Sequence, residues 1–181
     1  MNRSAGFTLV ELMAVTAIVA ILLTIGLPSY RYITNSYRLS SEVNGLLGDL
    51  MYARAEAIKE GNGVTVCVSS NATSCSGAAT WQNGWIIFSN PTNAANPAAG
   101  TVLRVQAKFT GSDTFISNTG VSAVTYNREG FATTAAGFPN TIITLHDSTA
   151  NSAWTRCLTI SPQGLVATET HLTSVPAGAC T

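Results

Sequence analysis

The feature that most constrains the fold is an apolar run at residues 7–27, which contains a single charged side chain, Glu11. As an α-helix this run would be ~32 Å long, at about 1.5 Å per residue, which is enough to cross the apolar core of a bilayer. A short leader, residues 1–6, precedes the run, carries one basic residue, Arg3, and ends in Gly6. A carboxylate inside such a run is costly and is usually retained for a function. The chain is therefore expected to begin with a membrane-spanning helix.

Two simpler interpretations of this segment explain less of it. A cleaved secretory signal would need small residues soon after the apolar run, whereas Pro28, Tyr30 and Tyr32 follow it. A plain membrane anchor would explain the hydrophobicity but not Glu11 or the glycine before the run. Because Arg3 is expected to stay on the cytoplasmic side, the rest of the chain is expected outside the cytoplasm.

The segment that joins the leader to the apolar run resembles the class III signal of type IV pilins and of the pseudopilins of type II secretion. It reads Gly6-Phe7-Thr8-Leu9-Val10-Glu11-Leu12. The resemblance implies that a prepilin peptidase cuts between Gly6 and Phe7 and methylates the new N-terminus at Phe7. It also implies that subunits leave the inner membrane and pack their helices into a filament. There the Glu11 carboxylate is expected to pair with the Phe7 ammonium of the adjacent subunit, because a buried unpaired charge is costly.

Composition limits the classes of partner and points to an oxidising compartment. The 181 residues suit one domain plus an anchor, and a formal charge of zero gives no bulk attraction for a polyanion.

The four cysteines lack zinc-site spacing, and their even number outside a membrane segment suggests disulfides. Three pairings are possible. The favoured pairs are Cys67–Cys75, which flank a turn-rich segment, and Cys157–Cys180, which would tie down the C-terminus.

Periodicity divides the rest of the chain into a helix and a strand-rich region. Apolar residues three and four apart after Val43 predict an amphipathic helix that Gly61-Asn62-Gly63 ends. The predicted organisation is a leader (1–6), a membrane or filament-core helix (7–28), its amphipathic continuation (29–60) and an extracytoplasmic head (61–181). The fold class is α+β, a pilin-like long helix packed on antiparallel sheet. The predicted strands are 64–68, 84–88, 101–108, 121–127, 141–146, 155–161 and 165–168.

A second resemblance, to the GspH, FimT and FimU branch of minor pilins and pseudopilins, rests on three segments. These are the helix end Tyr52-Ala53-Arg54-Ala55-Glu56-Ala57, the segment Trp81-Gln82-Asn83-Gly84-Trp85 after a cysteine-bearing strand, and a strand–turn–strand at residues 157–166. The resemblance implies a minor pilin that helps to prime pilus assembly in a complex at or near the tip. The expected partners are other minor pilins, the major pilin and the inner-membrane assembly platform. The alternative is pseudopilin H of a type II secretion system, with other pseudopilins as partners.

Catalysis and nucleic-acid binding are not expected. The two histidines, His146 and His171, are not arranged for a nucleophile relay, and no metal, cofactor or phosphate motif is present in the sequence. Some FimT-like relatives bind DNA through a Gly-Arg-x-Arg motif, but the matching place here is Gly164-Leu165-Val166-Ala167, without arginines. A DNA-binding role would need the scattered basic residues to gather in space. These are Arg104, Lys108, Arg128 and Arg156.

Overall fold

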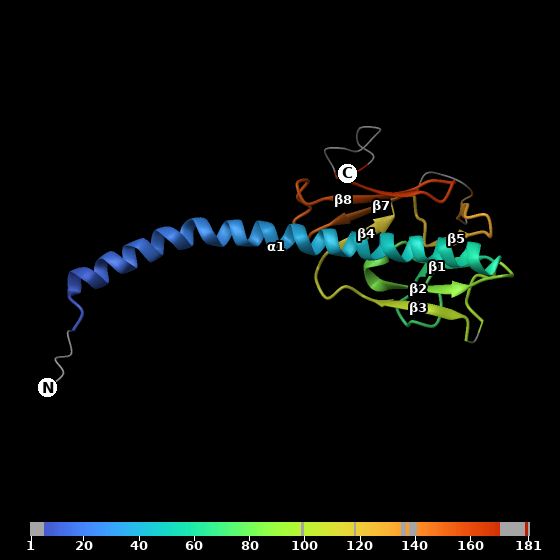
Figure 1. The fold of residues 1–181 in the computed structure, drawn as a ribbon, viewed down its shortest axis with the longest axis horizontal. Coiled ribbons are helices and arrows are strands. Elements are labelled where there is room, and N and C mark those ends of the chain that lie inside the picture. Colours follow the sequence, from blue (N-terminus) through green and yellow to red (C-terminus); the bar gives the residue numbers. More distant parts are fainter. Residues whose placement is uncertain are drawn as a thin grey trace. The chain divides into compact units, whose positions relative to one another are not determined.

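The structure is a computed structural model of the chain, and it describes residues 6–98, 100–117, 119–134, 137, 141–170 and 180. The chain divides into two compact units, Met1–Tyr37 and Arg38–Thr181, and the second unit is called the head below. One helix, α1 (Leu9–Glu60), begins in the first unit and ends in the head (Figure 1). The predicted α+β fold, a long N-terminal helix packed on antiparallel sheets, is confirmed.

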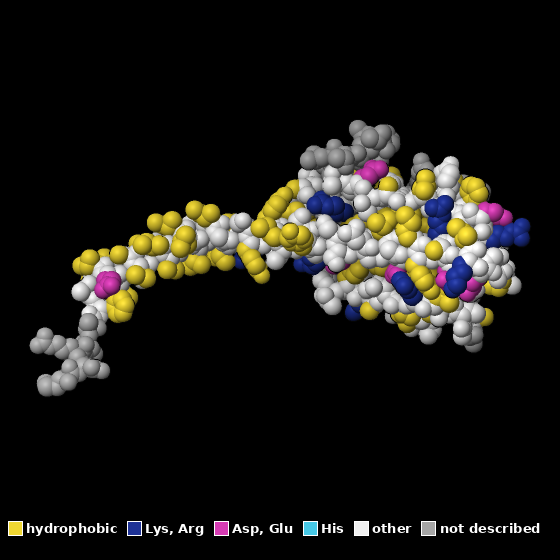
Figure 2. All heavy atoms as spheres, in the orientation of Figure 1, with side chains coloured by type: hydrophobic (Ala, Val, Ile, Leu, Met, Phe, Trp, Pro, Cys, Tyr) yellow, Lys and Arg dark blue, Asp and Glu magenta, His cyan; other side chains and the backbone are white. Residues whose placement is uncertain are grey.

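In the first unit, α1 is apolar and has no side chain buried by the protein. Its most apolar window has a mean hydropathy of 2.4, and none of that window is buried. This is the one helix among the described residues that is long and apolar enough to cross a membrane, judged by length and composition. Figure 2 shows hydrophobic side chains along this part of α1, with an acidic side chain near its start. The helix continues through Gly26 and Pro28.

The head contains two antiparallel sheets. The first has the strand order β3-β2-β1-β5-β6 and the second has the order β4-β7-β8-β9 (Figure 1). A short 3-10 helix, η1 (Trp81–Asn83), precedes β2. The strand bounds are β1 (Val64–Val68), β2 (Gly84–Ser89), β3 (Val102–Ala107), β4 (Thr114–Ser117), β5 (Ala123–Tyr126), β6 (Ala132–Thr133), β7 (Thr141–His146), β8 (Arg156–Ile160) and β9 (Val166–Thr170).

The part of α1 inside the head supplies one wall of the main hydrophobic core. Its buried residues recur every three or four positions, so they form one stripe along the helix. The stripe packs with inward-facing residues of both sheets, among them Val66, Tyr126 and Leu158. Burial of several such side chains, at about 1.5–3 kcal/mol each, stabilises the helix against the sheets. The stripe consists of Leu39, Val43, Leu46, Leu50, Ala53 and Ala57.

The first sheet is covered on both faces, which explains why every residue of β1 is buried. On the face away from α1, Cys67 packs with Ile86 and Phe88 in a second small core. Cys75, in the segment between β1 and η1, packs against this core and is joined to Cys67 by a disulfide. The bond therefore holds the β1–η1 segment over the outer face of the sheet.

The tryptophans of the Trp-x-x-Gly-Trp segment are core residues with satisfied ring nitrogens. Trp81 donates its Nε1 hydrogen to the Val121 carbonyl at 3.0 Å, and Trp85 donates to Asp49 of α1 at 2.8 Å. The two ring centroids are 6.4 Å apart. Gly84 lies between the two tryptophans in the sequence and has a φ of +96°. A Cβ at this position would approach the Gln106 carbonyl oxygen to 2.5 Å. Glycine at this position lets β2 lie directly against β3.

Two strands were not predicted from the sequence. β4 (Thr114–Ser117) alternates between part-exposed and buried residues but has only four residues, and β6 (Ala132–Thr133) has two. Both lie at sheet edges, where pairing with one neighbour defines the strand. The seven predicted strands are all present, and their bounds differ by at most a few residues.

Candidate assembly site

The predicted processing segment, Gly6 to Thr8, immediately precedes α1. Gly6, Phe7 and Thr8 are exposed and non-helical, and a Cβ at Gly6 would meet no other atom within 4 Å. The bond between Gly6 and Phe7 is therefore open to a protease without unwinding the helix. Phe7 itself is 82% exposed.

Thr8 and Glu11 together start the helix. The Thr8 hydroxyl oxygen accepts a hydrogen bond from the backbone N–H of Glu11 at 3.2 Å, and the Thr8 carbonyl accepts one from Leu12 at 3.2 Å. Thr-x-x-Glu at this position is the sequence of a capping box, and an acidic residue in the first turn also suits the helix dipole. Only an assembly role was predicted for Glu11 from the sequence; this local role was not predicted, although the Thr8–Glu11 spacing signals it.

The Glu11 side chain is exposed, and in the described part of the chain no hydrogen bond or ion pair reaches its carboxylate. The helix cap uses the backbone of Glu11 and leaves both carboxylate oxygens available. An ionised carboxylate without a partner is costly in an apolar environment.

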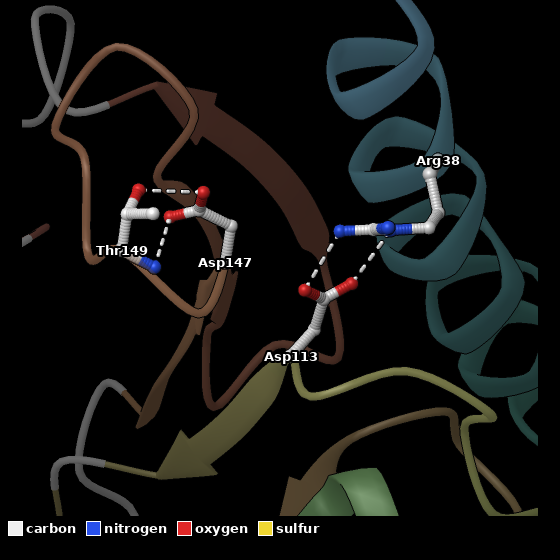
Figure 3. Close-up of polar contacts among 4 residues, drawn as sticks. All are labelled: Arg38, Asp113, Asp147 and Thr149. Carbon is white, nitrogen blue, oxygen red and sulfur yellow. Dashed lines mark hydrogen bonds and ion pairs between the residues drawn. The ribbon is translucent and has the colours of Figure 1, made fainter. Parts of the chain in front are cut away.

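The head contains a charged cluster that begins at its first residue, Arg38 of α1. Arg38 makes a two-pronged ion pair with Asp113, with Nε and Nη2 at 2.8 and 2.9 Å from the two carboxylate oxygens (Figure 3). The Asp113 side chain is fully buried, whereas that of Arg38 is 46% exposed. Such bidentate pairs fix orientation as well as charge. The pair therefore attaches the loop between β3 and β4 to the helix.

Glu42, one turn after Arg38, joins the same cluster. The pKa of the Glu42 carboxyl is raised to about 7, mainly by burial and next by the negative charge of Asp113, while the positive charge of Arg38 opposes the shift. Two neighbouring carboxyl groups with one arginine favour retention of a proton on Glu42. Both residues lie within the amphipathic helix predicted at residues 29–60, and neither was predicted as part of a site. Nothing in the sequence relates them to Asp113, which is 75 residues from Arg38.

His146 and Asp147 contact different groups in the described part of the head. His146 shares a hydrogen bond with the Thr155 hydroxyl at 3.0 Å. Asp147 is buried and accepts hydrogen bonds from the Thr149 backbone and hydroxyl, which closes the turn after β7 (Figure 3). The second histidine, His171, lies outside the described residues.

Three of the four basic residues considered for DNA binding make contacts within the protein, and the fourth is Lys108. Arg104 pairs with Asp49 at 3.2 Å and its guanidinium lies 3.7 Å from the centroid of the Tyr52 ring. Arg128 pairs with Glu129 at 2.8 Å, and Arg156 donates to the carbonyls of Ala153 and Thr155. No groups of three or more potential metal ligands occur within the described ranges.

The structure joins the four cysteines as Cys67–Cys75 and Cys157–Cys180, the two pairings favoured by the sequence. The second bond connects β8 to the penultimate residue of the chain, and both of its cysteines are buried. The two bonds thus secure the β1–η1 segment and the C-terminus.

Comparisons with known proteins agree with this organisation. The model of the prokaryotic N-terminal methylation motif matches residues 1–27, and the model described as type II transport protein GspH matches residues 42–164. No curated protein matches the chain.

Two crystal structures of the type IV minor pilin FimU of Pseudomonas aeruginosa share the fold. The first has a TM-score of 0.59 at 21% identity and covers 76% of this chain and 92% of FimU. The second, in another crystal form, has a TM-score of 0.54 at 21% identity and covers 74% and 91%. The GspH model matches most of the head, and the methylation motif matches the start of α1. The chain therefore belongs to the GspH family of the type IV pilin and pseudopilin superfamily.

Proposed function

We propose that this protein is a minor pilin of a type IV pilus that helps to prime filament assembly. The observation that carries the proposal is the combination, in one chain, of a methylation motif, an exposed apolar helix and a head with the fold of FimU. The likeness to FimU supports the fold, and the methylation motif supports an assembling subunit. The role is structural, as for the family, and needs no cofactor.

Processing is proposed to begin with cleavage of the Gly6–Phe7 bond by a prepilin peptidase, followed by methylation of the Phe7 amine. The exposure of both residues and their position before the first helical turn support this step. Cleavage removes Arg3 and places Glu11 fifth in the mature chain. The new N-terminus at Phe7 then lies four residues before Glu11 in the sequence.

Glu11 is proposed to bind the N-terminal ammonium of Phe7 in an adjacent subunit. The available carboxylate of Glu11 supports this pairing, as does the cost of leaving such a charge in an apolar surrounding. One ion pair per subunit contact would neutralise both charges and set the axial register. The adjacent subunits are other minor pilins and the major pilin.

Before assembly, the apolar part of α1 is proposed to span the bacterial inner membrane with the head in the periplasm. Its composition and its exposed surface support insertion in a bilayer, and the basic leader favours this orientation. An inner-membrane assembly platform would then move the subunit into the filament, at or near the tip.

A clean gene deletion tests the proposal when surface pili and secreted proteins are scored in the same strain. Loss of pili with normal secretion, restored by the gene in trans, is the expected result. Normal pili would overturn the minor-pilin assignment.

The second candidate, pseudopilin H of a type II secretion system, is favoured by the description of the matching family model. It shares the signal, the helix and the head, so the same deletion separates the two. Secreted proteins trapped in the periplasm, with pili unaffected, would identify the chain as the pseudopilin.

A further inference from the structure

The turn between α1 and β1 contains an asparagine followed by a glycine, Asn62-Gly63. The chain holds two more such dipeptides, Asn44-Gly45 inside α1 and Asn83-Gly84 at the junction of η1 and β2. An asparagine before glycine is prone to lose its side-chain amide, because glycine has no side chain to hinder attack by its own backbone nitrogen. The attack also requires that this nitrogen and the asparagine side chain can move together. The structure separates the three sites on this requirement.

At two of the sites, hydrogen bonds hold the reacting groups in place. Gly45 lies inside α1, so its backbone N–H donates to a carbonyl of the preceding turn. The Gly84 backbone N–H donates to the Trp81 carbonyl. The Asn83 side chain donates to the Thr80 hydroxyl oxygen at 2.9 Å. At both sites, at least one of these bonds must break before the attack.

The third site, Asn62-Gly63, lacks such restraints. Asn62 is exposed, and within the described residues no hydrogen bond involves its side chain or the Gly63 backbone N–H. The Gly63 carbonyl accepts a hydrogen bond from the Asn90 backbone, which leaves the attacking nitrogen unoccupied. Gly61, with φ of +67°, precedes Asn62, so both neighbours of the asparagine are glycines. Asn62 and Gly63 also line a surface pocket of about 340 Å³, which gives water access to them.

The fold requires the glycine that makes this site reactive. A Cβ at residue 63 would lie 2.6 Å from the Asn90 carbonyl oxygen. This oxygen belongs to the backbone, so it cannot turn aside as the end of a flexible side chain would. Any other residue after Asn62 would slow the reaction but would also displace the segment at Asn90. The close packing at Gly63 therefore maintains the reactive dipeptide.

We propose that Asn62 is a site of spontaneous deamidation in the folded protein. The Gly63 backbone nitrogen forms a bond to Cγ of Asn62, and the bond from Cγ to Nδ2 breaks. The proton of the attacking nitrogen leaves with the amide as ammonia, and a cyclic succinimide remains. Water then opens one of the two C–N bonds of the ring, which yields aspartate or its isomer isoaspartate. This inference does not depend on the proposed function.

The reaction changes the charge of the surface pocket. Its charged lining residues, Arg128 and Glu129, pair with each other at 2.8 Å, so the lining is neutral before the reaction. The new carboxylate at residue 62 gives the lining a net negative charge. It also lies directly after α1, at the negative end of the helix dipole, where no favourable interaction with the helix offsets it.

Mass spectrometry of the full-length protein, kept folded in detergent micelles at neutral pH, tests the proposal. Samples taken over days are reduced and digested. Conversion at each of the three asparagines is then measured from the mass gained when NH2 is replaced by OH. Asn62 is expected to convert about tenfold faster than Asn44 or Asn83, or more, since hydrogen bonds must break first at those two sites. In guanidinium chloride, where the fold is lost, the three rates should become similar.

Two variants identify the reacting residue. Asn62→Gln would have to close a larger, slower-forming ring, so it should abolish the isoaspartate that accumulates in the folded protein. Isoaspartate is measured by methyl transfer with an isoaspartyl methyltransferase. Asn83→Gln is the matched control and should leave the amount at the wild-type level.

The proposal is overturned by any of three results. The first is a rate at Asn62 in the folded protein that does not clearly exceed the rates at Asn44 and Asn83. The second is a rate at Asn62 that falls about tenfold or more on folding, because the fold would then protect this site as well. The third is undiminished isoaspartate in Asn62→Gln, which would place the reaction at another residue.

Discussion

At the scale of single residues, the cluster of Arg38, Glu42 and Asp113 shows how the head controls charge in its interior. The Asp113 side chain is buried completely, so its charge depends on the two-pronged ion pair with Arg38. Glu42 has no second arginine to balance it, and its protonated form is therefore favoured. Arg38 and Glu42 lie in the helix predicted at residues 29–60, but their contact with Asp113 could not be predicted because it forms only in the folded chain.

The raised pKa of Glu42, about 7 instead of 4.5, predicts how the stability of the head changes with pH. Below pH 4.5 the carboxyl is protonated in the folded and unfolded states alike, so its favourable state in the fold is retained. Between pH 4.5 and 7 only the unfolded chain releases the proton, so the free energy of unfolding falls as pH rises. The loss is expected to be on the order of 2 kcal/mol after allowance for solvent screening.

Glu42→Gln is the variant that isolates this effect, because it keeps the shape of the protonated side chain. Urea unfolding of both proteins from pH 4 to pH 8 should show a smaller decrease for the variant. Parallel stability curves for the two proteins would contradict the prediction. Glu129→Gln, an exposed carboxylate in a turn, serves as the control and should keep the wild-type slope.

At the scale of elements, most of the head could be predicted because hydrophobic periodicity is local. The stripe from Val43 to Ala57 and the strand at Val64–Val68 follow directly from the spacing of apolar residues, whereas Leu39 was not predicted as part of the stripe. The contact between the two turns at Gly130 and Gly164 could not be predicted, because each glycine alone signals only a turn. The capping role of Thr8 was predictable from its spacing to Glu11 but was missed.

Gly164→Ala tests how much the contact between the turns contributes to the head. The substitution combines a positive φ with a collision against the Gly130 carbonyl, so a loss of about 3 kcal/mol or more is expected. Gly120→Ala is a matched control, since Gly120 has a similar φ, +71°, with no other atom within 4 Å of a Cβ. It should cost only ~1 kcal/mol. Equal losses in urea unfolding would show that the contact adds nothing beyond backbone strain.

Two variants at the start of α1 separate the effect of the Glu11 charge from the effect of the helix cap. Glu11→Gln keeps the backbone N–H that Thr8 accepts but removes the negative charge. The expected result is a processed, methylated protein that remains in the membrane and is absent from sheared surface filaments. Mass spectrometry of the N-terminus and immunoblots of both fractions measure this.

Thr8→Ala is the opposite variant, because it removes the cap, at a cost of about 1 kcal/mol, and keeps the carboxylate. It should still enter the filament. Wild-type amounts of Glu11→Gln in the sheared fraction would rule out the proposed ion pair with Phe7.

At the scale of the whole molecule, the division between the two units implies that the head folds without the apolar part of α1. Every residue of the main core lies at or after Leu39, and both disulfides lie in the head. A chain that starts at Arg38 keeps the complete core stripe and the ion pair with Asp113. It is expected to be soluble without detergent and to unfold in a single cooperative transition.

A chain that starts at Asn44 is the discriminating control. It lacks Leu39 and Val43 from the core stripe and leaves the buried Asp113 without Arg38. Two lost core side chains and one unpaired buried charge together should lower the free energy of unfolding by more than ~4 kcal/mol. Thermal unfolding by circular dichroism compares the two chains. If the chain from Arg38 were as unstable as the chain from Asn44, residues before Arg38 would have to contribute to the fold of the head.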